Sequence, residues 1–321
     1  MLRHTGIGVV AGLASALLIG VVVQATPLAL ALYLLAPLPI LIVAMGWSHR
    51  TGLVAAASGT LALALAASPL RGLAFLVSTA LPAWWLGYLA LLGRTRADGG
   101  MEWYPTGRLL AWVAVTAAIA LVVVVMLSSG DHAAYQERVQ RLARGMLQLQ
   151  LQETPSRGAG LDEDDLARIA ERVAGLAPAI MATTFTLLLT FYLWAGARVV
   201  QISGRLARPW PDLAATALPR RALWGLAAGA ILAVAPGYAG AFGVALVGAF
   251  AAALALQGLA AIHDRSRDKP GRTPLLIGLY VLVFLTQGVA LAALALFGLV
   301  DALTGRRRPA QPPAGGLPPR R

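Results

Sequence analysis

The chain lacks the residues and short motifs on which most catalytic sites depend. It has no cysteine, which excludes disulfides, thiolate nucleophiles and cysteine metal ligands. The motifs H-E-x-x-H, G-x-S-x-G and Walker A do not occur in it. No two of its four histidines have the spacing of metal ligands. We therefore expect no catalytic residues, no cofactor, no metal site and no enzymatic activity.

Charge is also scarce. Charged residues make up 12% of the 321 residues, and only 14 residues are acidic, whereas an ordinary soluble domain is about 25% charged. Hydrophobic residues make up 58%, and the mean hydropathy is +0.72. These values exclude a soluble domain and a disordered chain. They predict an all-α, polytopic transmembrane helical bundle surrounded by lipid.

The excess of positive charge has two possible meanings. A net charge of +12 and a pI near 11.2 would suggest nucleic-acid binding in a soluble protein. Here the arginines lie in short loops between apolar segments, as in the cytoplasmic loops of membrane proteins. We therefore expect no nucleic-acid partner.

About nine apolar segments, with eight to ten possible, approach the length of roughly 20 residues that a membrane span requires. They cover residues 7–23, 28–45, 53–67, 73–92, 109–127, 176–197, 222–235, 239–262 and 274–303. The third and seventh are short. The last is too long for one span and too short for two, and we expect it to break at Thr286-Gln287-Gly288. The first run exceeds the apolar core of a signal peptide, so we interpret it as an uncleaved span.

These segments divide the chain into four parts. Residues 1–129 hold the first five spans, and residues 176–305 hold the rest. Residues 130–175 predict an amphipathic helical hairpin that lies on the bundle or on the bilayer surface, with a break at 155–160 and a second helix starting at Asp162. Its first helix has an apolar face at Tyr135, Val139, Leu142, Met146 and Leu149. Residues 306–321, rich in proline, glycine and arginine, predict a disordered basic tail.

The distribution of arginine predicts the orientation. With the N-terminus inside, nearly all arginines of the short loops lie on the cytoplasmic side. The sequence therefore predicts a multi-pass protein of a bacterial inner membrane with a cytoplasmic N-terminus and an extracytoplasmic hairpin.

Small residues recur at every fourth position of the first span, at Gly8, Gly12, Ala16 and Gly20. Such a stripe lets two helices approach closely. One interpretation is contact with another helix of this chain, and the other is docking of a separate membrane subunit.

Three predicted inner loops combine tryptophan, arginine and glycine. Their candidate docking residues are Trp47, Arg50, Trp103, Arg108, Arg205, Arg208 and Trp210. One interpretation is that each loop anchors its own helices at the membrane interface. The other is a single cytoplasmic face that binds a partner or an anionic headgroup.

No ionisable residue lies at the centre of a predicted span, which argues against a proton-coupled carrier. The polar groups that remain in the spans are neutral, and they suit either hydrogen bonds between helices or the lining of a small-ligand site. They are Thr183, Thr184, Thr186, Thr190, Tyr192, Gln257, Thr286 and Gln287.

Several stretches carry a resemblance to a family. They are Ala36-Pro37-Leu38-Pro39-Ile40 followed by Gly46-Trp47, Leu81-Pro82-Ala83-Trp84-Trp85-Leu86-Gly87-Tyr88, residues 205–212, and Gly298-Leu299-Val300-Asp301. With these, most of the chain resembles the YybS-like bacterial membrane proteins. More distantly, it is similar to the S components of energy-coupling-factor transporters. That resemblance implies a ligand-binding role and a transmembrane coupling subunit that meets small residues of the first helix.

Two functions remain open from the sequence. The first is a small-ligand-binding or transport-accessory membrane subunit without catalysis of its own, with a membrane coupling subunit or a cytoplasmic protein as partner. The second is a scaffold for envelope assembly or cell shape, which needs no ligand.

Overall fold

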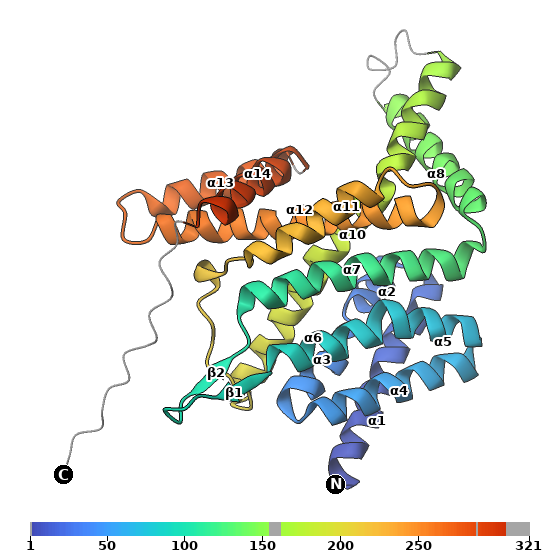
Figure 1. Ribbon diagram of the computed structural model, residues 1–321. Helices are drawn as coiled ribbons and strands as arrows, with labels where there is room; N and C mark the ends of the chain where they lie inside the picture. The colour runs from blue at the N-terminus through green and yellow to red at the C-terminus, as the bar shows by residue number, and fades with distance from the viewer. Residues whose placement is uncertain (1, 154–161, 287, 306–321) are drawn as a thin grey trace, which may run out of the picture.

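The computed structural model describes residues 2–153, 162–286 and 288–305, and most of them are helical (Figure 1). The tail 306–321 and the predicted break at 155–160 lie outside the described residues. In the first third of the chain, the helices are α1 (Leu2–Gly20), the 3-10 turn η1 (Val21–Gln24), α2 (Pro27–Leu34), α3 (Pro37–Gly46), α4 (His49–Ala66), α5 (Pro69–Phe75), the π-helical turn η2 (Leu76–Ala80) and α6 (Leu81–Ala90).

A β-ribbon and two long helices form the middle of the chain. They are β1 (Gly93–Thr95), β2 (Met101–Trp103), α7 (Thr106–Ser129), α8 (His132–Glu153) and α10 (Glu163–Ile202). After the short turns η3 (Leu213–Ala215) and η4 (Arg220–Ala222) come α11 (Leu223–Leu232), α12 (Gly237–Arg265), α13 (Arg272–Thr286) and α14 (Gly288–Thr304). One described helix reaches Thr286 and the next begins at Gly288, and Gln287, the centre of the predicted break, lies outside the described residues.

Six helical segments of the described chain are long and apolar enough to cross a membrane. They are His4–Gln24, Pro27–Gly46, Pro69–Ala90, Thr106–Ser129, Glu163–Ile202 and Gly237–Arg265. Three of the nine predicted segments do not reach this standard: α4, α11 and the broken pair α13 and α14. Helices α13 and α14 are apolar but have only 15 and 17 residues.

Proline and hydroxyl side chains determine where several helices begin. Thr26, Ser48 and Ser68 each accept a hydrogen bond from a backbone N–H of the following helix. Pro37 starts α3 after a break at Ala36, where proline removes a backbone donor. The carbonyl of Ala36 at this break accepts a hydrogen bond from the buried hydroxyl of Ser15 on α1. This backbone acceptor therefore has a partner inside the bundle.

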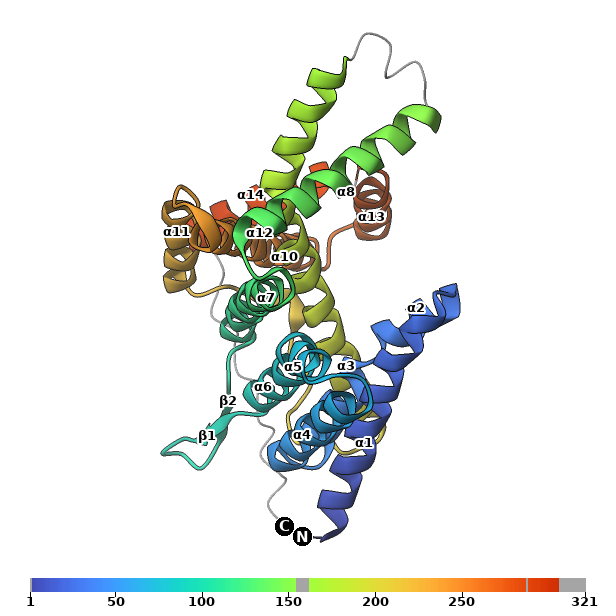
Figure 2. The same cartoon turned by 90° about the vertical axis from the view of Figure 1, so that its right-hand side faces the viewer.

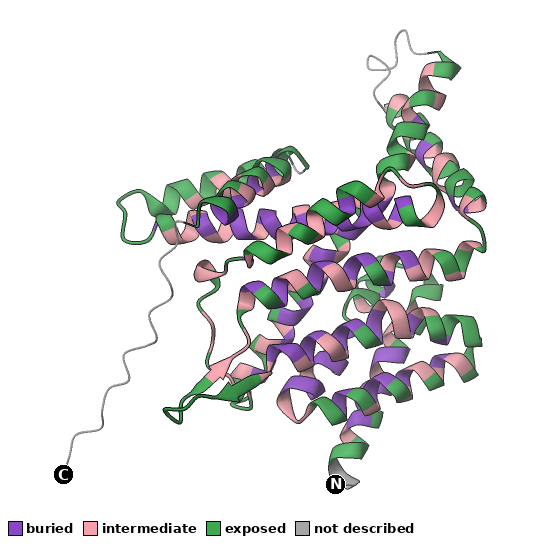
Figure 3. Ribbon diagram, in the orientation of Figure 1, coloured by how far each residue is buried: buried purple, intermediate pink, exposed green. Residues whose placement is uncertain are grey.

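Two buried clusters make up the core, and α7 and α10 contribute to both (Figure 3). The first joins these helices to α1, α3, α4 and α6 around Ile40, Leu41 and Leu86. The second joins them to α12 and α14 around Ala249 and Phe250. Helix α13 contributes no buried residue to either cluster.

The prediction of an all-α fold is incomplete, because a short antiparallel ribbon joins α6 to α7. Gly93 pairs with Trp103, and an ion pair of 2.8 Å joins Arg94 to Glu102 across the strands. The turn contains Asp98-Gly99, and Gly99 has a positive φ of 80°. An Asp-Gly pair is a strong hairpin signal, so the sequence did contain the evidence for this ribbon.

Both helices of the predicted hairpin are present, and Asp162 and Asp165 form the capping box that starts α10. Helix α10 then runs unbroken for 40 residues through Pro178, or about 60 Å at 1.5 Å per residue. That length is about twice the hydrocarbon thickness of a bilayer. Accordingly, α8 and the first half of α10 project from the bundle (Figure 2).

The predicted apolar face of α8 is covered only at its beginning. Tyr135 is buried, whereas Leu142, Met146 and Leu149 are exposed. The residues most buried farther along the pair are alanines, Ala143 on α8 and Ala170 on α10.

Candidate ligand-binding cleft

A cleft of about 670 Å³ lies between the helices that carry the two core clusters. Its walls come from the end of α6, the start of α7, the second half of α10 and the last turns of α12, and Tyr280 of α13 also contributes. The connection between α10 and α11, residues 203–222, lines the cleft from Leu206 to Thr216. We call this connection the cleft loop.

The walls are mostly apolar. Leucines, alanines and aromatic rings predominate, among them Leu109, Val113, Leu187, Phe191, Leu193, Trp194, Leu256 and Leu259. The few polar side chains are Thr106, Thr190, Arg208, Thr216, His263 and Tyr280. Apolar walls with a small number of placed polar groups are typical of small-molecule sites.

Arg208 is the most unusual side chain of the lining. One of its guanidinium nitrogens donates a hydrogen bond of 3.1 Å to the carbonyl of Ala90, at the end of α6. No ion pair joins Arg208 to a carboxylate in the part of the chain that the structure describes. Partial burial lowers the pKa of this guanidinium from its ordinary value. The cleft therefore contains a partly desolvated cation whose charge no neighbouring acid balances.

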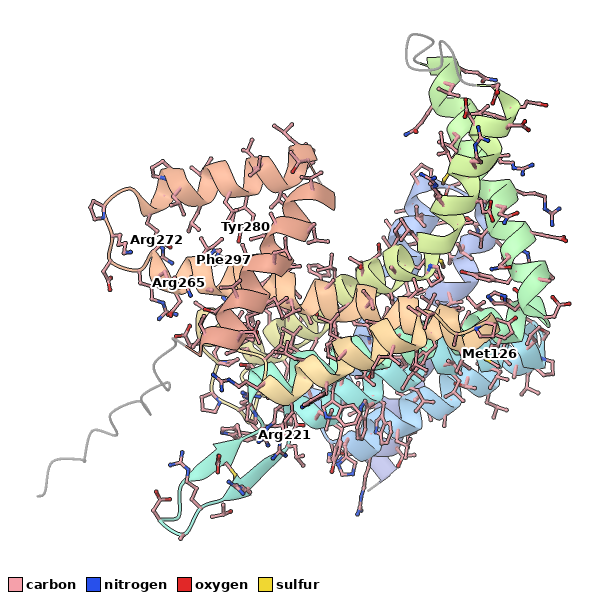
Figure 4. The ribbon with its side chains drawn as sticks, turned by 45° about the horizontal axis from the view of Figure 1, so that its top comes forward. Met126, Arg221, Arg265, Arg272, Tyr280 and Phe297 are labelled. Carbon is pink, nitrogen blue, oxygen red and sulfur yellow. The ribbon has the colours of Figure 1, made fainter. Side chains whose placement is uncertain are left out.

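A second polar pair lies where α12 meets α13. The phenolic oxygen of Tyr280 is 3.3 Å from Nε2 of His263, and Nδ1 of His263 is 3.0 Å from the carbonyl of Leu259. Figure 4 shows Tyr280 on the layer formed by α12, α13 and α14. This pair ties the exposed helix α13 to the edge of the cleft.

The cleft loop is fastened to three helices by hydrogen bonds from its own residues. Besides the Arg208 bond to α6, the hydroxyl of Thr216 lies 3.2 Å from that of Thr106 on α7. The backbone N–H of Leu218 donates to the side chain of Gln257 on α12 at 2.9 Å. Gly107 permits this arrangement, because a Cβ there would collide with the backbone of Ala217.

An ion pair fixes the middle of the loop from outside. The carboxylate of Asp212 accepts a hydrogen bond from Arg267. This bond lowers the pKa of Asp212 below its ordinary value. Arg267 also pairs with Asp264 at 3.4 Å, so Asp212 and Asp264 contact the same cation.

A buried polar network holds the far end of the loop. Asp301 on α14 is 2% exposed, and it accepts hydrogen bonds from Arg265 at 2.6 Å and from Gln257 at 2.9 Å. Arg265 also lies over the ring of Phe297, 4.9 Å from its centre, and Figure 4 shows the two side by side. Gln257 thus joins the loop to Asp301, a structural role that accounts for its place within the span. Thr190, another of the neutral polar residues within the predicted spans, lines the cleft instead.

The predicted docking residues separate into groups. Arg205 lies over the ring of Trp47 at 4.5 Å, and Arg198 lies over Trp210 at 5.5 Å. Trp210 and Arg208 line the cleft, whereas Trp47 lines a different hollow, between α1 and α3.

The other docking residues lie apart from the cleft. Trp103 is in the β-ribbon opposite Gly93, and Arg50 and Arg108 are exposed near the starts of α4 and α7. Among described residues, no ring or cation contact joins Trp103 to the other two tryptophans. The structure therefore brings only Trp47, Arg205, Arg208 and Trp210 to the cleft loop, and the remaining three residues of the predicted set lie elsewhere.

The small-residue stripe of α1 lies partly against α4. A Cβ at Gly8 would lie 2.7 Å from the carbonyl of Thr51, and one at Gly12 would collide with Ala55 and Ser58. Ala16 is also buried, while a Cβ at Gly20 would meet nothing within 4 Å. The first part of the stripe thus makes an internal helix contact, one of the two interpretations that the sequence allowed.

Several arginines lie at the end of the bundle that holds the cleft. Figure 4 places Arg221, Arg265 and Arg272 at one end and Met126, near the end of α7, at the other. Among the described residues no group of three histidines or acids is arranged to hold a metal ion. The described site is thus an apolar cleft at the arginine-rich end of a helical bundle.

These features define the class: a multi-pass integral membrane protein built of apolar helices. The chain belongs to the family described as "Predicted membrane protein (DUF2232)", whose sequence model matches residues 13–302. No curated protein and no solved structure matches the chain. The family match supports the membrane class. It does not support the resemblance to YybS-like proteins or to the S components of energy-coupling-factor transporters.

Proposed function

We propose that this protein is a membrane subunit that binds a small, largely apolar ligand in the cleft beneath the cleft loop. The observation that carries the proposal is the cleft itself. Its volume of about 670 Å³ falls within the 300–1,000 Å³ typical of ligand sites. Its few polar groups can orient a ligand, and its apolar walls supply the contact area.

The proposal includes a role without catalysis, as a binding or transport-accessory subunit. The described residues that line the cleft include no aspartate or glutamate to serve as a general acid or base beside the histidine. We also propose a bacterial inner-membrane location with a cytoplasmic N-terminus, supported by the arginine-rich end of the bundle. A coupling subunit would contact α1 outside the stretch from Gly8 to Gly12, which packs against α4.

One observation favours the alternative role as an envelope scaffold. The hairpin of α8 and α10 projects from the bundle with Leu142, Met146 and Leu149 exposed. An exposed apolar patch away from the membrane-spanning helices is a typical protein-binding surface.

Native mass spectrometry after mild extraction separates the two roles. We expect the wild-type chain to carry a bound small molecule. Leu187→Trp, which fills the cleft, should lose it. The matched variant Val199→Trp is on the same helix, and Val199 is exposed and lies outside the cleft lining, so this variant should keep the ligand. Equal occupancy in all three proteins, or a protein partner without any ligand, would contradict the binding proposal.

A further inference from the structure

The electrostatics of the cleft restrict what its ligand can be. Among the described residues that line it, Arg208 and His263 are the only titratable side chains besides Tyr280, and none is a carboxylate. The nearest acids of the loop and of α12, Asp212 and Asp264, both contact Arg267. Two further arginines, Arg198 and Arg205, lie over tryptophan rings close to the loop. The cleft is therefore positively charged and lacks an internal counter-ion.

The guanidinium of Arg208 retains unused hydrogen-bonding capacity. It has five N–H donors in a planar fork, and the described bond to the Ala90 carbonyl uses one of them. Burying a cation is costly unless an anion balances it. A carboxylate or phosphate matches the fork with two parallel hydrogen bonds.

The rest of the lining excludes a small free anion as the natural occupant. Beyond Arg208, the surface consists mainly of leucine, alanine and aromatic side chains of α7, α10 and α12. A hydrated ion would fill only the polar part of this volume and leave the apolar part empty. The apolar part instead suits an aliphatic or prenyl chain, because burial of apolar surface favours binding.

Taking as given the proposed function, in which the cleft binds a ligand, we infer that this ligand is an anionic amphiphile. Its carboxylate or phosphate head contacts Arg208 on the cleft loop, and its chain lies against Leu187, Phe191 and Leu256. Trp210, beside the head, is a residue type enriched at the level of lipid headgroups. A membrane lipid and a free fatty acid share this chemistry.

Tryptophan fluorescence offers a direct test, because Trp194 and Trp210 both line the cleft. Quenching is measured with a dibrominated long-chain fatty acid, the corresponding fatty alcohol, and a dibrominated lysophosphatidate, using purified protein in a neutral detergent. We expect the wild-type protein to bind the two anions at least about tenfold more tightly than the alcohol, as a charge-assisted hydrogen bond provides. Inorganic phosphate should not displace either anion.

Three variants identify the group responsible. Arg208→Gln should lose the tenfold preference while keeping its affinity for the alcohol, and Arg208→Lys should keep part of the preference. Arg205→Gln removes a cation of the same loop that does not line the cleft, so it should retain the preference. If Arg208→Gln also lowers the affinity for the alcohol, the residue shapes the cleft and the inference is wrong.

The outcomes separate this inference from the proposed function. Equal binding of acid and alcohol by the wild-type protein would overturn the anionic head and leave the binding role intact. Displacement by inorganic phosphate would overturn the amphiphile and indicate a free anion. A preference for the phosphate head over the carboxylate indicates a lipid source, and the reverse indicates a fatty acid. Failure of every probe to bind would contradict the proposed function itself.

Discussion

The protein contains two hollows of similar size and very different chemistry. The cleft beneath the cleft loop has a volume of about 670 Å³, and the hollow between α1 and α3 has about 590 Å³. The cleft has an arginine, a histidine, a tyrosine and three threonines in its lining. The hollow is lined by Gly6, Ile7, Val10, Ala11, Ala14, Pro39, Ile42, Val43 and Trp47, none of which carries a charge or a hydroxyl.

The difference arises from how each is enclosed. The α1–α3 hollow lies between two apolar helices whose small residues leave space. The cleft is bordered by a polar connection that α6, α7 and α12 hold in place through Arg208, Thr216 and Leu218. Volume alone therefore does not distinguish a binding site from a packing gap, whereas polar groups fixed in position do.

The largest expected effect comes from breaking the polar network behind the cleft loop. Asp301→Asn removes the anion from a position that is 2% exposed and weakens two hydrogen bonds, to Arg265 and Gln257. We expect a loss of about 2–3 kcal/mol in stability, since hydrogen bonds to charged groups contribute about 1.5–3 kcal/mol. Ligand affinity should fall as well, because Gln257 also holds Leu218. Thermal unfolding in detergent measures the first effect and fluorescence quenching the second.

Asp264→Asn is the matched control for this variant. Asp264 is partly exposed and contacts Arg267 at 3.4 Å, so its loss should change stability by less than about 1 kcal/mol. Equal effects of the two substitutions would show that the network around Asp301 does not stabilise the cleft loop.

The next effect concerns the packing of α1, the helix that borders the other hollow, against α4. In Gly12→Leu the new side chain collides with Ala55 and Ser58 of α4, and overpacking of this kind costs about 1–3 kcal/mol. It should separate α1 from α4 and leave ligand binding in the cleft unchanged. Gly20→Leu, which meets nothing within 4 Å, should be neutral. A Gly12→Leu protein with wild-type thermal stability would show that the close contact between α1 and α4 is unimportant.

The smallest effect is a dependence on pH. Because the Arg267 bond lowers the pKa of Asp212, this link stabilises the loop at and above the ordinary aspartate pKa of about 3.9. The stabilisation from this ion pair is lost as the pH falls through the lowered pKa of Asp212. Hydrogen exchange of residues 210–216 should stay constant from pH 7 to about pH 5 and increase at lower pH, after correction for the intrinsic rate. In Asp212→Asn this acid-dependent increase should disappear.

Local rules explain what the sequence could predict. The capping box at Asp162 follows from a signal a few residues long, and it is present. The Asp98-Gly99 signal of the β-ribbon is equally local, but the apolar composition drew attention to helices alone. The stripe predicted a close contact for Gly12, although no pattern could show that its partner would be Ala55.

The cleft depends on contacts that no local pattern contains. Arg208 and Ala90 are 118 residues apart, and Thr216 and Thr106 are 110 apart. The sequence selected Arg208 and Trp210 as the arginine and tryptophan of a loop, and both lie in the connection between α10 and α11. Their position in the lining of a cleft could not be predicted, because the folding of that loop against α6 and α7 follows only from tertiary packing.

The most direct test of the binding role is photo-crosslinking in native membranes. A fatty acid carrying a photoreactive group on its chain is added, and the crosslinked peptides are mapped by mass spectrometry. We expect crosslinks concentrated on residues 187–197 of α10 and 256–260 of α12, and their loss in Leu187→Trp. Crosslinks spread over the lipid-exposed faces of α1 and α13, unchanged in Leu187→Trp, would contradict the binding role.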